Sequence, residues 1–443
     1  MSARLKAALL CLIMLSACLS SAAQTKNYVI LAAGQGRGST AFAESVAAAG
    51  GLTVANLEHI GVVTATSDDP QFAARMAAMP GVKAVAEDPE IQWINNETAV
   101  AVNEADLSPS GLNSEPFWGY QWNMRYIRAD KTAELGLQGF GARVAVLDSG
   151  MITQHPDIAA NVNQTLKKSY VPGEGVDPLN PGFNHGTHVG GIIAAAINDR
   201  GTQGVAPRAE LVPIKVLREN GKGSFGWLIQ GLAYAESIQA DVANMSLGAV
   251  FFRNPNVGCE VSTVECNAGY LMAALNRAIN HATAAGVLSV SSAGNEGVDL
   301  NSQIVSIPAQ SGHGMAVSAL GPYNQANFDR LASYSNYGQS VINVAAPGGD
   351  GASENVMDYV LAPGGFALNA DGSISYRYYF AVGTSMAAPH VSGLAAVLVG
   401  QYGHIGPTRL QSLIQQSAVD ILKPGADPQT GKGRIDALAA TQQ

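Results

Sequence analysis

From residue 144 onward, this 443-residue chain alternates short, continuously apolar runs with helix-like segments. A run that is apolar at every position is typical of a strand covered on both faces. Such strands form mainly parallel sheets that lie between layers of helices. We therefore predict an α/β fold with three αβα layers for this part of the chain. The runs are residues 144–147, 211–217, 242–245, 287–290, 315–319 and 341–345.

A smaller module precedes this part, between about residues 27 and 94. Its strand and helix patterns follow the order βαββαβ, which predicts a ferredoxin-like α+β fold. The predicted strands are 28–31, 52–57, 61–66 and 82–85, and the predicted helices are 39–49 and 69–79. Residues 95–116 show little apolar periodicity and predict an exposed linker. The glycine-rich residues 348–372 predict a long loop.

The charge balance argues against one class of partner. The chain has 34 Asp and Glu against 25 Lys and Arg, a net charge of −9, and its cations form no run. Nucleic-acid binding requires clustered Lys and Arg, so we expect no nucleic-acid partner. No window reaches the roughly 18 to 20 apolar residues that a membrane-spanning helix requires.

Residues 1–23 have the three-part pattern of a secretory signal peptide. Arg4 and Lys6 precede an apolar stretch at 7–17, and small residues follow through Ala23. Residues 15–18 also match a lipobox, in which Cys18 receives a lipid. Cleavage after Ala23 and lipidation of Cys18 both remain open. We expect a secreted chain, or a cell-envelope lipoprotein that contacts the membrane if Cys18 is lipidated.

Cys259 and Cys266 are the two cysteines outside the signal segment. In an exported chain, two cysteines at this spacing predict one disulfide that closes a small loop. A structural zinc site is the weaker alternative, because it requires four Cys or His ligands and no second pair stands nearby.

Three segments carry the residue types that nucleophilic catalysis requires. Asp148 ends a buried strand, His185 begins a small-residue helix, and Ser385 lies at the start of the apolar helix that runs to residue 399. A serine hydroxyl requires an imidazole to remove its proton, and the imidazole requires a carboxylate to orient it. The Asn295 amide and the backbone N–H of Ser385 would bind the oxyanion.

Other interpretations of these residues are weaker. His188, His155 and His390 are expected to be structural, because a lone histidine is more often a packed residue than a catalytic one. An α/β-hydrolase requires Gly-x-Ser-x-Gly, and Ala387 occupies the last place of that motif. A secreted binding protein on an inactive scaffold of the same fold would have lost a catalytic group, and none is lost.

The chain resembles the subtilase family of subtilisin-like serine proteases, peptidase family S8. The resemblance is carried by residues 146–150, 185–189, 244–248, 293–295 and 383–390, with the catalytic order Asp, His, Ser. It implies a subtilisin-like catalytic domain at 117–443, which hydrolyses peptide bonds. It also implies that 24–95 is an inhibitor and chaperone propeptide, and that the linker 96–116 contains the bond cut during self-processing.

The resemblance further implies a pocket for the substrate residue before the cleaved bond. The residues that border it are Ser246, Leu247, Gly248, Ser292, Ala293 and Gly294. These residues include no carboxylate, so we predict an apolar or broad preference. No cofactor is required for the chemistry. Asp157 matches a position that binds calcium in the family. The loop at 198–204 is shorter than the calcium-binding loop of the family, so a structural calcium ion is possible but not required by the resemblance. We expect a monomer that binds peptide substrates and its own propeptide.

Overall fold

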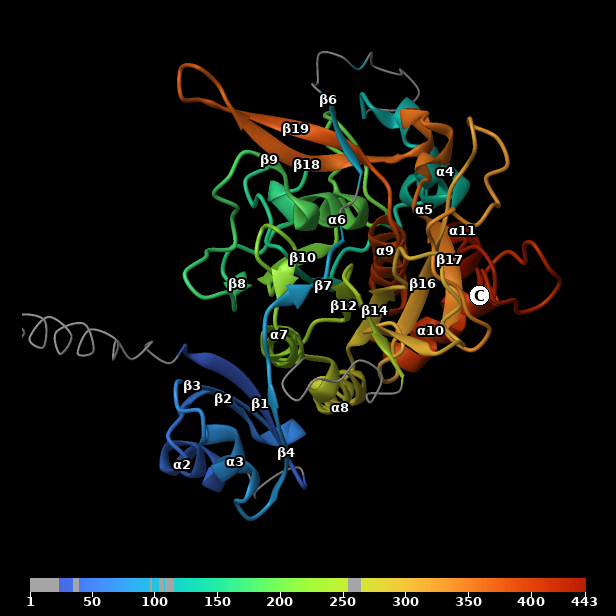
Figure 1. Cartoon of the computed structure of the whole chain (residues 1–443). Coiled ribbons are helices and arrows are strands. Elements are labelled where there is room, and N and C mark those ends of the chain that lie inside the picture. Colours follow the sequence, from blue (N-terminus) through green and yellow to red (C-terminus); the bar gives the residue numbers. More distant parts are fainter. Residues whose placement is uncertain (1–23, 35–39, 96–97, 103–106, 108–114, 254–263) are drawn as a thin grey trace, which may run out of the picture. The chain divides into compact units, whose positions relative to one another are not determined.

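The computed structural model describes residues 24–34, 40–95, 98–102, 107, 115–253 and 264–443. The chain divides into two compact units, Met1–Glu87 and Asp88–Gln443 (Figure 1). The predicted signal segment with Cys18, and the predicted pairing of Cys259 with Cys266, involve side chains outside the described residues. Within the described part of the chain, the helices are too short or too polar to cross a membrane.

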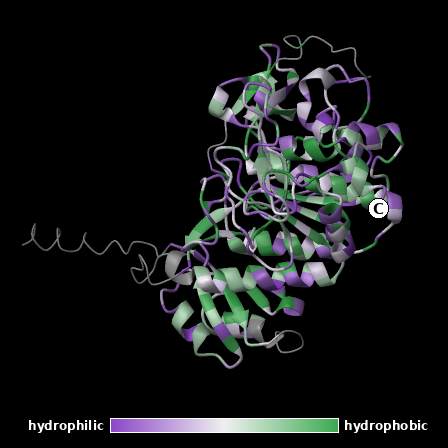
Figure 2. Ribbon diagram, turned by 90° about the vertical axis from the view of Figure 1, so that its right-hand side faces the viewer, coloured by the Kyte–Doolittle hydropathy of each residue, from purple (hydrophilic) through white to green (hydrophobic). Residues whose placement is uncertain are grey.

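The first unit is a four-stranded antiparallel sheet with two helices. The strand order is β2-β3-β1-β4, and the predicted βαββαβ sequence of elements is confirmed. Its core includes Tyr28 and Phe72, whose rings lie 4.8 Å apart, and Figure 2 shows its strands as mostly hydrophobic. The elements are β1 (Lys26–Ala32), α2 (Thr40–Ala48), β2 (Leu52–Leu57), β3 (Val62–Ser67), α3 (Phe72–Ala77) and β4 (Val82–Glu87).

The second unit is built on a seven-stranded sheet in the order β17-β16-β14-β12-β7-β10-β8. Every pairing in this sheet is parallel, and β12, β14 and β16 are buried along their whole length. The parallel sheet predicted from the continuous apolar runs is therefore confirmed. The strands are β7 (Arg143–Asp148), β8 (Lys168–Ser169), β10 (Glu210–Lys215), β12 (Val242–Met245), β14 (Leu288–Ser292), β16 (Met315–Leu320) and β17 (Ile342–Pro347).

Helices cover both faces of this sheet. Helices α6 (His185–Ala194) and α9 (Thr384–Tyr402) pack against each other on one face, and α7 (Phe225–Ser237) and α8 (Val264–Ala284) do so on the other (Figure 1). This arrangement confirms the three predicted layers. The remaining helices are α4 (Trp122–Tyr126), α5 (Ala129–Glu134), α10 (Pro407–Gln416) and α11 (Ala437–Ala440).

The predicted loop at 348–372 is wrong for much of its length. Strands β18 (Val360–Leu368) and β19 (Ile374–Ala381) form a long antiparallel hairpin in this region. The glycines here belong to a β-bulge and not to a loop, because the strand register shifts between Pro363 and Gly365. Gly365 also allows a close backbone contact, since a Cβ there would lie 2.3 Å from the carbonyl oxygen of Gly182.

Short strands complete the second unit. One of them lies inside the predicted linker 96–116: β6 (Ala99–Val102) pairs antiparallel with the edge of β19. Glu115, near the end of that linker, is fully buried. The others are β5 (Ile91–Gln92), β9 (Gly182–Phe183), β11 (Lys222–Gly223), β13 (Ala249–Phe252) and β15 (Ile304–Ile307).

Candidate active site

Asp148 and His185 lie against each other at the carboxyl edge of the sheet. Asp148 is the last residue of β7, and His185 is the first residue of α6. Nδ1 of His185 lies 2.8 Å from Oδ1 and 2.9 Å from Oδ2 of Asp148, and both side chains are buried. Gly186 permits this approach, because a Cβ there would lie 2.0 Å from the carbonyl oxygen of Gly150. The carboxylate can therefore hold the imidazole with its proton on Nδ1 and leave Nε2 to act as a base.

Ser385 lies in the first turn of α9, where the helix dipole favours negative charge. Its hydroxyl donates to the carbonyl oxygen of Ser246 at 3.3 Å, and the Ser246 hydroxyl donates to the carbonyl oxygen of Ser385 at 2.8 Å. These bonds fasten the start of α9 to the end of β12. Since α9 packs against α6, the helix N-termini that carry Ser385 and His185 belong to one face of the sheet.

Asn295 is held by the residue that precedes Ser385. Both the amide and the hydroxyl of Thr384 donate to Oδ1 of Asn295, at 2.9 and 2.7 Å. The Thr384 hydroxyl in turn accepts from the amide of Gly294 at 3.1 Å. Since Oδ1 is engaged twice, Nδ2 is the end of the Asn295 amide that can donate to a ligand. Thr384 is thus a site residue that sequence reasoning missed, although it stands directly beside Ser385.

The six residues predicted to border the pocket follow two neighbouring parallel strands. Ser246, Leu247 and Gly248 follow β12, and Ser292, Ala293 and Gly294 end or follow β14. The hydroxyl of Ser292 donates to the carbonyl oxygen of Leu247 at 3.2 Å. The buried Ser306 donates to the carbonyl oxygen of Ala293 at 2.9 Å. The structure therefore brings both predicted pocket segments together.

A carboxylate beside these segments, Glu296, was also missed. It directly follows Asn295 and is exposed. Its side chain accepts from Nδ2 of Asn95 at 3.0 Å and from Nδ2 of Asn336 at 2.6 Å. The prediction of an apolar or broad preference counted only the segments up to residue 294, and it stays a prediction.

Residues before Asn95 and the residue Thr98 are bonded to two different segments near the site. Before this stretch, β5 pairs with β11, and the carbonyl oxygen of Trp93 accepts from the amide of Gly248 at 2.8 Å. After it, the carbonyl oxygen of Thr98 accepts from the amide of Val382 at 3.3 Å, and β6 continues along β19. Gly248 stands two residues after Ser246, and Val382 three residues before Ser385. Trp93 and Thr98 are therefore each bonded to a segment that lies near the candidate nucleophile in the sequence or through Ser246.

Aromatic packing anchors the first part of this segment. The Trp93 side chain is buried, its ring centroid lies 4.8 Å from that of Phe225, and its Nε1 donates to the carbonyl oxygen of Gly223 at 3.0 Å. Asp88 accepts from the amides of Phe225 and Gly226, the first residues of α7, at 2.8 and 2.7 Å. Burial raises the pKa of Asp88 to about 6. Sequence reasoning missed this anchor because it depends on tertiary contacts.

The three histidines expected to be structural are buried and bonded to the fold. His188 lies 2.9 Å from the carbonyl oxygen of Tyr379, and burial lowers its pKa to about 3. Burial lowers the pKa of His155 and of His390 to about 4. These three rings stay neutral at physiological pH, which suits packing rather than proton transfer.

One oxygen of Asp157 is engaged by hydrogen-bond donors, and the other, Oδ1, is buried with no hydrogen-bond partner among the described residues. Calcium requires six to eight oxygen ligands. Oδ2 of Asp157 instead accepts from the amide and the hydroxyl of Thr202 at 3.0 and 2.8 Å. The buried Glu115 accepts from the amides of Asn198, Asp199 and Arg200 at 3.0, 3.0 and 3.2 Å. The loop therefore turns N–H groups toward both carboxylates. Burial, with the Glu115 charge as a smaller cause, raises the pKa of Asp157 to about 8.

Comparison with known proteins agrees with this geometry. Residues 139–433 match the model of the subtilase family, peptidase S8. Subtilisin E of Bacillus subtilis (strain 168) is 31% identical over 393 residues, which cover 89% of this chain and 84% of the relative. Subtilisin of Bacillus pumilus is 34% identical over 321 residues, 72% of this chain and 98% of the relative. The chain belongs to the subtilase family and is a subtilisin-like serine endopeptidase, which acts on peptide substrates.

A solved structure extends the likeness to the first unit. Fervidolysin of Fervidobacterium pennivorans, described as a keratinolytic enzyme related to subtilisin, superposes with a TM-score of 0.72 at 25% identity. The match covers 96% of this chain and spans 62% of the fervidolysin chain. The fold likeness therefore includes the ferredoxin-like unit as well as the parallel sheet.

Proposed function

We propose that Asp148, His185 and Ser385 form the catalytic triad and that the Asn295 side chain binds the oxyanion. Asp148 orients His185 and stabilises its cation, His185 takes the proton of Ser385 and returns it to the leaving amine, and Ser385 attacks the peptide carbonyl. The observation that carries this proposal is the contact of both Asp148 oxygens with Nδ1 of His185.

The oxyanion would lie between Nδ2 of Asn295 and the backbone N–H of Ser385. The two bonds from Thr384 to Oδ1 support this role, because they fix the Asn295 amide before substrate arrives. Donors fixed in advance require no reorganisation as charge develops. We therefore assign Thr384 the role of a positioning residue.

We further propose that the enzyme cuts its own chain between Asn95 and Thr98. This proposal is supported by two hydrogen bonds: the carbonyl of Trp93 accepts from Gly248, two residues after Ser246, and the carbonyl of Thr98 accepts from Val382, three residues before Ser385. Both ends of the stretch are thus held close to the nucleophile. Residues 24–95 would then be released as an inhibitor and chaperone propeptide. The cut falls at the start of the predicted linker 96–116, and β6 would begin the mature enzyme.

The same segment suggests how other substrates bind. An extended substrate would pair with β11 on one side and with Gly248 on the other, as residues 91–93 do. Trp93 occupies an aromatic site against Phe225, which favours large apolar residues two before Asn95. Glu296 lies near Asn95 and would accept polar or basic side chains there. We propose a broad preference on this basis.

Export remains part of the proposal. We propose that residues 1–23 direct secretion, with Cys18 as a lipid acceptor if the lipobox is used, and that Cys259 and Cys266 form a disulfide. We also propose that the enzyme is a monomer that needs no cofactor for its chemistry.

Casein hydrolysis tests the assigned roles. Wild type, Ser385→Ala and His185→Ala are compared, with and without a serine-directed inhibitor. Ser373→Ala, an equal change at an exposed turn, is the matched control. We expect wild type and Ser373→Ala to hydrolyse casein and to be inhibited, and the other two variants to be inactive. Retained activity in Ser385→Ala would refute the assignment.

A further inference from the structure

Arg218 binds the carboxylate of Glu90, the residue that directly precedes β5. Its Nε and Nη2 donate to the two oxygens of Glu90 at 2.7 and 2.8 Å. Such a parallel pair of bonds is the geometry in which a guanidinium recognises a carboxylate specifically. Glu90 lies five residues before Asn95, on the same extended stretch that pairs with β11.

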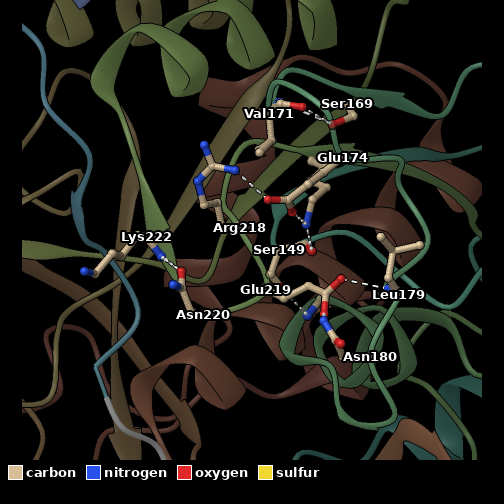
Figure 3. A network of polar contacts seen from close by, with 12 residues as sticks. Ser149, Ser169, Val171, Glu174, Leu179, Asn180, Arg218, Glu219, Asn220 and Lys222 are labelled. Carbon is tan, nitrogen blue, oxygen red and sulfur yellow. Dashed lines mark hydrogen bonds and ion pairs between the residues drawn. The ribbon is translucent and has the colours of Figure 1, made fainter. Parts of the chain in front are cut away.

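The guanidinium is held in place from its other side. Nη1 donates to Oε1 of Glu174 at 2.6 Å (Figure 3). The guanidinium carbon lies 5.3 Å from the centre of the Trp227 ring. Glu174 is itself fixed by the buried Lys215, 3.2 Å away, which donates to the carbonyl oxygen of Ser149 at 2.6 Å. Arg218 is therefore positioned by residues of the catalytic unit that do not depend on Glu90.

Glu90 and Glu174 bind different edges of the Arg218 guanidinium. Glu174 is shared between Arg218 and Lys215, and Lys215 also interacts electrostatically with Glu219 and Asp148. When self-processing releases the residues that include Glu90, the Nε and Nη2 edge of the guanidinium would lose its bidentate partner. A substrate acid at the same position would restore that pair.

We propose that Arg218 is a specificity-determining residue that selects substrates with an acidic side chain where Glu90 lies, five residues before the position of Asn95. This inference rests on the proposed function, because it assumes that substrates follow the path of the chain's own segment. The enzyme would thus prefer an acidic side chain at the position of Glu90, several residues before the cut, and would accept a broad range of side chains close to the cut.

The test uses self-processed wild-type enzyme and peptides that copy residues 88–102. The parent peptide is compared with Glu90→Gln and Glu90→Lys peptides. A peptide that carries Glu90→Gln together with Gln92→Glu has the parent charge but displaces the acid by two residues, and is the matched control. The readout is the ratio of kcat/KM values within each enzyme, which does not depend on how much of a variant is active.

We expect wild type to prefer the parent peptide to the Gln peptide by about fivefold at low salt, the range of a good but partly exposed ion pair. The displaced-acid peptide should resemble the Gln peptide. Arg218→Gln should abolish the preference, and Arg218→Glu should reverse it in favour of the Lys peptide. Lys423→Glu makes the same kind of charge reversal at an exposed residue outside the groove segments and should keep the wild-type ratio.

Two results would overturn the proposal in distinguishable ways. Equal hydrolysis of all peptides by wild type, or an unchanged preference in Arg218→Glu, would overturn the role of Arg218 and leave the protease assignment intact. Hydrolysis of none of the peptides by wild type would overturn the assumption that substrates follow the path of residues 88–95, and the role of Arg218 with it.

Discussion

Replacing Asp157 with Asn should change how stability depends on pH. Asp157 is fully buried, and its pKa is raised from 3.8 to about 8. An acid whose pKa is raised by folding binds its proton more tightly in the folded state. The free energy of unfolding is therefore highest below about pH 4 and falls as the pH rises toward 8. Asn cannot lose a proton, so the variant lacks this contribution.

The magnitude follows from the proton count. Between about pH 5 and pH 7, folded wild type holds close to one proton more than the unfolded chain at this site. The free energy of unfolding therefore falls by about 1.4 kcal/mol per pH unit, or about 3 kcal/mol over this interval. Relative to wild type, the free energy of unfolding of Asp157→Asn should therefore increase by about 3 kcal/mol between pH 5 and pH 7. Other titrating groups, Asp88 among them, contribute equally to both chains.

Urea unfolding followed by tryptophan fluorescence measures this difference. Both chains carry Ser385→Ala, which prevents self-digestion. Glu115→Gln provides a control, because removal of its negative charge should lower the pKa of folded Asp157, so that the fall in stability ends at lower pH and is smaller. Parallel stability curves for wild type and Asp157→Asn would show that Asp157 is ionised in the folded chain and would refute the reasoning.

Three further predictions concern the site. Thr384→Val removes a bond to Asn295 and should lower kcat about tenfold with little change in KM, as steady-state kinetics on a peptide substrate would show; an unchanged kcat would contradict its positioning role. Asp148→Asn should lower kcat about 10⁴-fold, because Asn no longer favours the Nδ1 proton of His185; a loss below tenfold would count against the triad. Excess calcium should shift the Tm of wild type and of Asp157→Asn equally, and a shift confined to wild type would reveal calcium at Asp157.

The catalytic elements could be predicted because their signals are local. Asp148 follows a run of apolar residues, and His185 and Ser385 stand at the start of small-residue helices, so the chain order alone places them at the carboxyl edge of a parallel sheet. Asn295 could be predicted for the same reason, since it follows β14.

The features that were missed depend on contacts between distant segments. The β18–β19 hairpin contains a proline and two adjacent glycines that indicate a loop in isolation, yet they form a bulge against Gly182. The pairing of Arg218 with Glu90 joins residues 128 positions apart. The amide-rich surroundings of Asp157 could not be predicted either, because Glu115 comes from a segment that resembles a linker in sequence.

The position of the self-cut tests the central claim most directly. Purified wild type and Ser385→Ala are followed by intact mass, and the new N-terminus of wild type is sequenced. We predict that wild type acquires an N-terminus at residue 96, 97 or 98, between the segments bonded to Gly248 and Val382, and that Ser385→Ala stays uncut. A first cut outside residues 95–98, or an identical cut in Ser385→Ala, would contradict the account.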